Sequence, residues 1–137
     1  MKRFEYEITV APDSIDQLGH VNNIEYVRWM QDAAMKHSEA SGLDWATYQS
    51  MRVAFVIRRN VIEYLREAKV GEVITVATWI ESATRITALR ATEIRNARGE
   101  PIVTARTTWV FVSLDTMRPV RITERVAEAF GGWPDKA

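Results

Sequence analysis

One segment near the N-terminus, from Asp16 to Asn23, gathers an acid, an imidazole and the carboxamides of Asn22 and Asn23 within eight positions. Asp16 precedes His20 by four residues, and Asn22 and Asn23 follow where a helix is expected to begin. A carboxylate can act as a nucleophile or activate water, and free backbone N–H groups at a helix start can receive an oxyanion. This pattern suits attack on a carbonyl group. The same residue types are ordinary in turns and caps between a strand and a helix, so a structural role competes on equal terms.

The elements around this segment are predicted by the period of the apolar residues. Alternation at period two predicts a strand over residues 4–10. Apolar residues at three- and four-residue spacing, without glycine or proline, predict one long helix from Asn23 to about Ser41. Asn22 or Asn23 can cap its start, and Gly42 can end it in a left-handed conformation.

The second half of the chain returns to period two. Four further strands are expected near residues 52–65, 72–82, 85–96 and 102–114, and their short connections favour antiparallel neighbours. Residues 44–51 form a loop with some helical character, and Thr123 can cap a short helix near the C-terminus. The sequence therefore predicts an α+β fold, with a five-stranded antiparallel sheet curled around one long central helix.

The composition is that of one ordinary domain, expected over residues 1–130 with a short tail over residues 131–137. The chain has no cysteine and only two histidines, which excludes thiol chemistry and a multi-histidine metal site. A net charge of zero argues against a nucleic-acid partner, and no apolar run is long enough to span a membrane. We therefore expect a cytoplasmic protein that binds neither nucleic acid nor membrane.

Two further expectations concern where side chains lie. His37 is expected to be an exposed residue of the long helix. The predicted strands carry more large apolar residues than one sheet face needs, which suggests that an oligomer buries some of them: Trp79, Ile80, Trp109 and Phe111.

One string of this segment strongly resembles the signature of hot-dog-fold acyl thioesterases: Asp16-x-x-Gly19-His20-Val21-Asn22-Asn23-x-x-Tyr26. The chain looks most similar to bacterial long-chain acyl-CoA thioesterases of the 4-hydroxybenzoyl-CoA thioesterase superfamily, and plant acyl-ACP thioesterases have a similar His-Val-Asn-Asn run. Residues 54–56 and 62–68 resemble the family's second strand, and residues 114–119 resemble its last turn. The resemblance implies a single hot-dog thioesterase domain over residues 1–130.

The resemblance implies hydrolysis of an acyl thioester on coenzyme A or acyl carrier protein, without a metal or redox cofactor. Asp16 matches the family's acid, which is a nucleophile in some members and a general base in others, and both roles stay open. His20 would orient Asp16 or water, or contact the thioester, and the backbone N–H of Asn23 would polarise the carbonyl. The side chains of Asn22 and Asn23 could cap the helix or hold water. Tyr26 would line the site or fill the core.

The same resemblance implies a homodimer or homotetramer whose sites are shared between subunits. The phosphates of coenzyme A could meet a basic rim, although exposed strand cations also serve solubility; the candidates are Arg58 and Arg59, with Lys69, Arg85 and Arg90. An apolar tunnel for the acyl chain would use residues from the helix and the following segments: Val27, Met30, Met35, Trp45, Met51 and Phe55.

Two departures from the plant enzymes limit the comparison. Leu18 occupies the position of their asparagine two residues before the histidine, so Asp16 is the expected catalytic group. Glu63 resembles their glutamate in a Glu-Tyr pair, but a surface strand residue is the alternative. Hydration or dehydration of an acyl thioester and non-catalytic acyl-CoA binding remain as competing functions.

Overall fold

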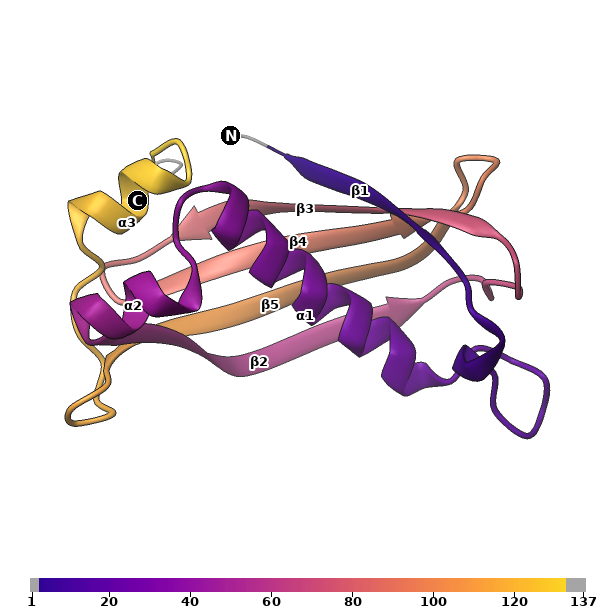
Figure 1. The fold of residues 1–137 in the computed structure, drawn as a ribbon, viewed down its shortest axis with the longest axis horizontal. Coiled ribbons are helices and arrows are strands. Elements are labelled where there is room, and N and C mark those ends of the chain that lie inside the picture. The colour runs from indigo at the N-terminus through magenta and orange to yellow at the C-terminus, as the bar shows by residue number, and fades with distance from the viewer. Residues whose placement is uncertain (1–2, 133–137) are drawn as a thin grey trace.

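The structure is a computed structural model that describes residues 3–132 (Figure 1). Of the predicted tail over residues 131–137, all but Gly131 and Gly132 lie outside the described residues. The elements run in the order β1 (Phe4–Thr9), a 3₁₀ turn η1 (Pro12–Ser14), α1 (Asn23–Ala40), α2 (Trp45–Met51), β2 (Val53–Tyr64), β3 (Val73–Ala83), β4 (Thr87–Arg95), β5 (Pro101–Ser113) and α3 (Glu124–Ala129).

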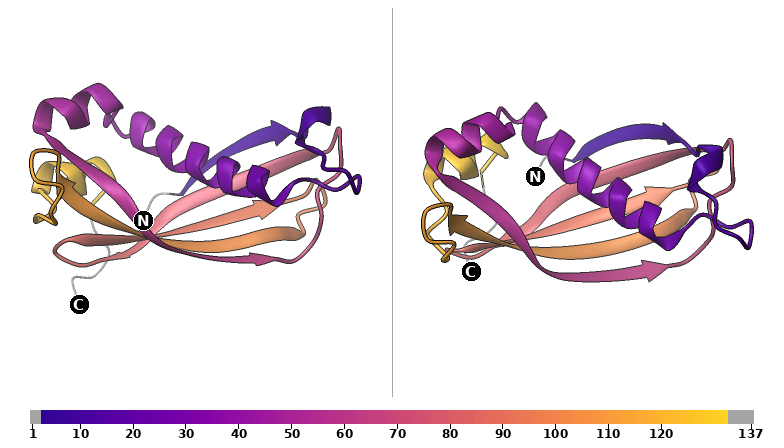
Figure 2. Two further views of the ribbon diagram at one scale, coloured as in Figure 1. Left: turned by 90° about the horizontal axis from the view of Figure 1, so that it is seen from below. Right: turned by 60° about the horizontal axis from the view of Figure 1, so that its bottom comes forward.

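The five strands form one sheet in the order β1-β3-β4-β5-β2, and every neighbouring pair is antiparallel. Helix α1 crosses one face of this sheet diagonally (Figure 1), and the side views show all three helices on that face (Figure 2). The predicted α+β class, the five antiparallel strands and the single long helix are confirmed. Strands β1 and β2 are the two edges, and a bulge interrupts β2 between Ile57 and Arg59.

Helix α1 begins and ends where the sequence predicts. The Asn22 side chain accepts a hydrogen bond from the Ile24 amide at 3.0 Å, and Gly42, at φ +85°, follows the C-terminal end. Ala33 and Ala34 of this helix are buried, and their small size permits close packing of the helix on the sheet. Within residues 3–132, no helix has the length and apolar character needed to cross a membrane.

Two clusters of buried side chains fill the space between helices and sheet. The first lies under the N-terminal half of α1, where Tyr26 and Trp29 pack against Ile74, Ile94 and Val103 of the sheet. The second lies under α2 and α3 and contains Leu43, Ile80, Phe111, Val126 and Phe130. The core is therefore divided along the helix, with large aromatic residues of α1 at one end only.

The expectation that large apolar strand residues need an oligomer to bury them is wrong for Ile80 and Phe111. Both belong to the second cluster, and Phe111 is fully buried, because α2 and α3 cover this part of the sheet. Trp109 is half-buried on the same face. Trp79 is on the opposite face, where the Arg3 guanidinium lies 4.3 Å from the centre of its ring.

His37 is buried, which corrects the expectation that it is exposed. Its ring stacks on Phe4 with centroids 5.6 Å apart and meets the Phe130 ring edge-on at 5.1 Å. Its Nδ1 accepts a hydrogen bond from Arg90 Nη1 at 2.9 Å. Burial, followed by the positive charge of Arg90, lowers the pKa of His37 to about 4. The sequence did not predict this because the groups that cover the ring come from β1, β4 and the end of α3.

The depressed pKa predicts a loss of stability in mild acid. Because the folded protein keeps His37 neutral down to about pH 4 while the unfolded chain protonates it near pH 6.5, unfolding takes up a proton between these values. The stability that this neutral histidine contributes is present above pH 6.5 and is lost as the pH falls toward 4. The loss is of the order of 2 kcal/mol, measurable by urea unfolding at a series of pH values.

A His37→Asn variant serves as the control, because its amide oxygen can still accept a hydrogen bond from Arg90 but does not titrate. We expect the difference in unfolding free energy between the two proteins to change across this window. Equal pH dependence in both proteins would contradict the prediction.

Candidate functional site

Residues 16–20 form a tight loop between η1 and α1. Its base is closed by an antiparallel bridge between Ile15 and Val21, and by a hydrogen bond of 2.7 Å from the Asp16 amide to the His20 carbonyl. Gly19 has φ +79°, a left-handed conformation that glycine adopts without strain. The loop therefore brings Asp16 and His20, which are four positions apart in the sequence, close together.

The Asp16 carboxylate is held by its own loop. One oxygen, Oδ1, accepts hydrogen bonds from the Leu18 amide at 2.9 Å and the His20 amide at 3.2 Å. The second oxygen, Oδ2, makes no hydrogen bond with any residue from 3 to 132. Asp16 thus combines a fixed orientation with one oxygen that remains available for chemistry.

His20 pairs with a residue that the sequence did not suggest. Its Nδ1 contacts Oε1 of Glu67, which lies in the connection between β2 and β3, and both side chains are about half exposed. An imidazole whose Nδ1–H donates to a carboxylate has a fixed ring orientation and keeps Nε2 for other contacts. Glu67 lies 47 positions away in the sequence, and its resemblance to the family's second strand did not indicate a contact with His20, so no local signal revealed the pair.

The start of α1 supplies a free backbone donor beside this loop. Asn22 caps the helix through its side chain, and its own amide donates to the Ser14 carbonyl at 2.8 Å. The Asn23 amide, the first of the helix, has no acceptor among the described residues. Such an amide at the positive end of an 18-residue helix is suited to bind a negative or polarised oxygen.

Tyr26 lies in the core rather than on an open surface. Its side chain is buried, packs edge-on against Trp29 and contacts the ring of Tyr64. Its hydroxyl accepts a hydrogen bond of 3.2 Å from the Ala68 amide, and burial raises its pKa. Because Ala68 directly follows Glu67, Tyr26 fixes the backbone that carries the partner of His20.

The predicted basic rim is only partly exposed. Arg58 and Arg59 lie at the bulge of β2, are exposed and form no ion pair within residues 3–132. Arg90, in contrast, is buried under α1, so its predicted place in a basic rim is wrong. Alternation along the strand could not predict this, because it does not say which face carries the helix. No group of three or more metal-ligating side chains occurs among the described residues.

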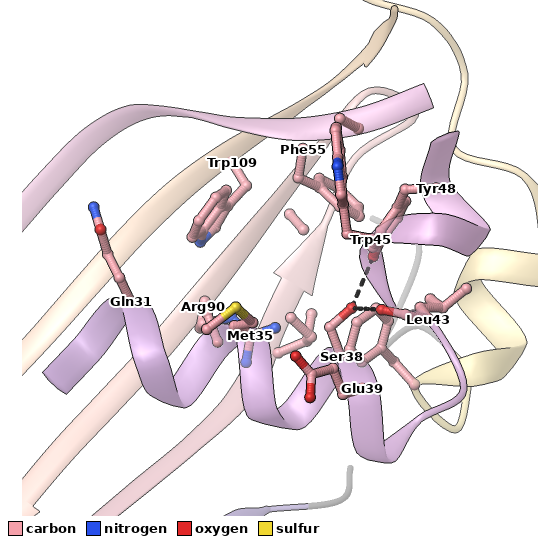
Figure 3. A pocket seen from close by; sticks show the side chains of 15 residues that line it. Gln31, Met35, Ser38, Glu39, Leu43, Trp45, Tyr48, Phe55, Arg90 and Trp109 are labelled. Carbon is pink, nitrogen blue, oxygen red and sulfur yellow. Dashed lines mark hydrogen bonds between the residues drawn. The ribbon is translucent and has the colours of Figure 1, made fainter. Parts of the chain in front are cut away.

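A cavity of about 330 Å³ lies between the C-terminal half of α1, α2 and the sheet (Figure 3). Of the residues predicted to contact an acyl chain, Met35, Trp45 and Phe55 line it. The Ser38 hydroxyl donates to the Leu43 carbonyl at 2.7 Å and lies 3.1 Å from the Tyr48 hydroxyl, which ties α1 to α2 at one wall.

The other three predicted tunnel residues lie elsewhere. Val27 and Met30 border a separate pocket of only about 10 Å³, and Met51 packs against the second core cluster. None of residues 16–26 lines the 330 Å³ cavity. At 1.5 Å rise per residue, the two ends of α1 are roughly 27 Å apart. In one chain the Asp16 loop and the cavity therefore lie toward opposite ends of the helix.

A family model of the thioesterase-like superfamily matches residues 10–130. Among solved structures, a Lactobacillus plantarum protein described as an oleoyl thioesterase superimposes with a TM-score of 0.93 at 23% identity, over 99% of this chain. This chain spans 53%, about half, of the length of that protein. A comparison with curated proteins finds no match.

Two Staphylococcus aureus structures are similar over nearly their full lengths. A DHNA-CoA thioesterase has a TM-score of 0.85 and 22% identity, covering 96% of this chain and 90% of that one. The protein SAV2348, solved in complex with CoA, has a TM-score of 0.87 and 18% identity, covering 99% and 89%. These likenesses confirm the predicted hot-dog fold.

The geometry of the helix start predicts that Asn22 contributes to stability. We expect Asn22→Ala to lower the free energy of unfolding by about 1 kcal/mol, because the Ile24 amide loses its acceptor. Asn22→Asp, which keeps an acceptor oxygen and adds a negative charge at the helix start, should unfold close to the wild type. Urea unfolding at pH 7 measures both variants, and equal losses in the two would argue against the cap.

Proposed function

Because this chain belongs to the thioesterase-like superfamily, we propose that it hydrolyses an acyl thioester of coenzyme A, with acyl carrier protein as the alternative carrier. The observation that carries the proposal is the Asp16 carboxylate, oriented by two amides through one oxygen and open at the other. The free Asn23 amide at the start of α1 supplies the second requirement, a donor for the carbonyl oxygen. The SAV2348 complex supports coenzyme A as the carrier.

In the proposed reaction the Asn23 amide donates to the thioester oxygen and makes the carbonyl carbon more electrophilic. As a general base, Asp16 takes a proton from water while the water oxygen attacks the carbonyl carbon. The carbon–sulfur bond of the resulting tetrahedral intermediate then breaks, and the thiolate takes up a proton. As a nucleophile, Asp16 would instead form a mixed anhydride that water hydrolyses. Both routes yield a carboxylic acid and a thiol.

His20 and Glu67 act together in this proposal. Glu67 fixes the imidazole through Nδ1, and Nε2 is then the nitrogen that can hold the attacking water or contact the thioester. Tyr26 is a positioning residue, since its hydroxyl holds the backbone next to Glu67. The side chain of Asn22 maintains the helix start, and that of exposed Asn23 could hold water.

We further propose that the active form is at least a homodimer, joined along β2. Among the strands that the structure describes, this edge strand pairs only with β5, and it exposes apolar side chains, among them Val61 and Tyr64. Antiparallel pairing of two β2 strands about a twofold axis would bring the start of one α1 beside the cavity of the partner. A shared site of this kind would bridge the length of α1 that separates Asp16 from the cavity within one chain.

In the same arrangement the exposed guanidinium groups of Arg58 and Arg59 lie on the joining strand, where they could bind the phosphates of coenzyme A. No metal or redox cofactor takes part in the proposed hydrolysis. We expect the protein to act in the cytoplasm, where acyl-CoA and acyl carrier protein are used.

Replacing Asp16 tests the proposed chemistry. Asp16→Asn keeps an oxygen that can accept from Leu18 and His20, so the loop should fold while kcat for acyl-CoA hydrolysis falls by about 10²- to 10⁴-fold. Thiol release from short, long and aromatic acyl-CoAs measures the effect. Asp13→Asn, an equal loss of charge on exposed η1, is the matched control and should retain activity.

Equal turnover by wild type and a folded Asp16→Asn variant would remove Asp16 from the mechanism. No turnover of any acyl-CoA would favour an acyl-ACP substrate, to be assayed next, or a protein that binds acyl-CoA without hydrolysing it.

The proposed dimer is tested by adding a charge to the open edge. Val61→Lys should convert dimers to monomers and lower hydrolysis in parallel, because a lysine on an edge strand disfavours pairing with a second strand. Light scattering with size-exclusion chromatography measures the mass. Thr104→Lys adds the same charge to β5, one strand away from the edge, and should remain dimeric. A wild type that is monomeric and fully active would refute the shared site.

A further inference from the structure

Arg90 is a buried cation without a buried anion to match it. It lies on β4 with 5% of its surface exposed, and it forms no ion pair with any carboxylate of residues 3–132. Burial lowers its pKa to about 10, so it remains protonated at neutral pH. Buried charges in proteins are normally paired, because an unpaired charge loses the stabilisation that water provides.

One end of the Arg90 guanidinium is already occupied. Nη1 donates to Nδ1 of His37 at 2.9 Å and to Oγ1 of Thr78 at 3.1 Å, and the group faces the ring of Phe130 at 5.8 Å. Nε is buried without a partner, and Nη2 makes no hydrogen bond with a described residue. The free Nε–Nη2 edge presents two parallel N–H donors, which is the arrangement that binds both oxygens of a carboxylate.

A second unpaired donor lies on the same sheet face. Nε1 of Trp109, on β5, is also buried and has no hydrogen-bond partner among residues 3–132. Trp109 pairs with Ala88 in the register of β4 and β5, two residues from Arg90, so both side chains point to the helix side. Arg90 and Trp109 both line the 330 Å³ cavity, and Figure 3 shows them on its wall opposite α2. Unmade hydrogen bonds of buried donors are costly, which calls for an acceptor.

The rest of the cavity wall is mostly apolar. Met35, Phe55, Ile80 and Phe130 contribute hydrocarbon surface. Besides Arg90 and Trp109, the polar lining residues are Gln31, Ser38, Glu39 and Tyr48, and the Ser38 hydroxyl is already engaged with the Leu43 carbonyl. A ligand that matches this cavity has an apolar body and one anionic group, placed on the wall to which Arg90 and Trp109 belong. A hydrocarbon chain alone would fill the volume but would leave all these donors unpaired.

We propose that the cavity binds an acyl group that carries a carboxylate at the end remote from the thioester, with Arg90 and Trp109 as its donors. This inference builds on the proposed thioesterase function and on the shared site of the proposed dimer, and it names the substrate class. The Nε–Nη2 edge of Arg90 binds the carboxylate, the Trp109 indole donates a further hydrogen bond, and the apolar wall contacts the methylene groups. Arg90 and Trp109 are thus specificity-determining residues.

The test compares three thioesters of equal chain length: adipoyl-CoA, 6-hydroxyhexanoyl-CoA and hexanoyl-CoA. We expect kcat/KM of the wild type to be at least about tenfold higher for adipoyl-CoA than for either of the other two. Higher or equal kcat/KM for hexanoyl-CoA or the hydroxyl compound would overturn the proposal. Hydrolysis of hexanoyl-CoA alone would leave the thioesterase function intact while removing this substrate class.

Variants separate recognition from a structural role. In Arg90→Met the ratio of adipoyl-CoA to hexanoyl-CoA turnover should fall below one, and in Trp109→Phe, which removes only the indole N–H and some ring area, it should fall a few-fold. Arg106→Met is the matched control, because Arg106 lies on the outer face of β5, paired with Glu81, away from the cavity. Its ratio should equal that of the wild type. An unchanged ratio in both Arg90→Met and Trp109→Phe would overturn the assignment.

Direct binding covers the case in which Arg90→Met does not fold or no thioester is hydrolysed. Monomethyl adipate and methyl hexanoate differ only in the terminal carboxylate, and calorimetry with wild-type protein compares their affinities. Tighter binding of monomethyl adipate, weakened in Trp109→Phe, supports the carboxylate site even if hydrolysis fails. Equal affinities would refute it.

Discussion

A single long helix has to cover one face of a five-stranded sheet, and the mismatch in width shapes the rest of the molecule. Strands spaced about 4.8 Å apart make a sheet roughly twice as wide as a helix with its side chains. Under the first half of α1, Tyr26 and Trp29 are large enough to fill the gap. Under the second half the helix presents Ala34 and Ser38, and α2 closes the far side, so a cavity remains. The cavity is thus a consequence of incomplete coverage.

The reactive groups lie where the same helix begins. The Asp16 loop, the cap of Asn22 and the free amide of Asn23 all depend on the way the chain turns from η1 into α1. This region is exposed, but it is anchored to the core through Tyr26, whose hydroxyl holds the strand exit that carries Glu67. A site that orients a carboxylate and admits a substrate needs both a rigid support from the core and access from solvent.

The sequence predicted those features that depend on neighbours along the chain. The period of apolar residues located all five strands and α1, and short-range capping rules located the start of α1 at Asn22. Features that depend on distant segments were missed or misjudged. Glu67 meets His20 only after folding, and His37 and Arg90 are buried because α1, β1, β4 and the end of α3 converge around them.

The order of strands in the sheet also bears on how the protein forms during synthesis. β1 pairs with β3, and β2 pairs with β5, so both edge strands come from the first half of the chain and their partners from the second. A nascent chain that has emerged from the ribosome only as far as Tyr64 carries α1 and two strands with no sheet to join. Its apolar side chains stay unburied until the β3–β5 meander is complete. Formation of the sheet therefore waits until β5 has been made, and the nascent first half is the stage most open to chaperones and to aggregation.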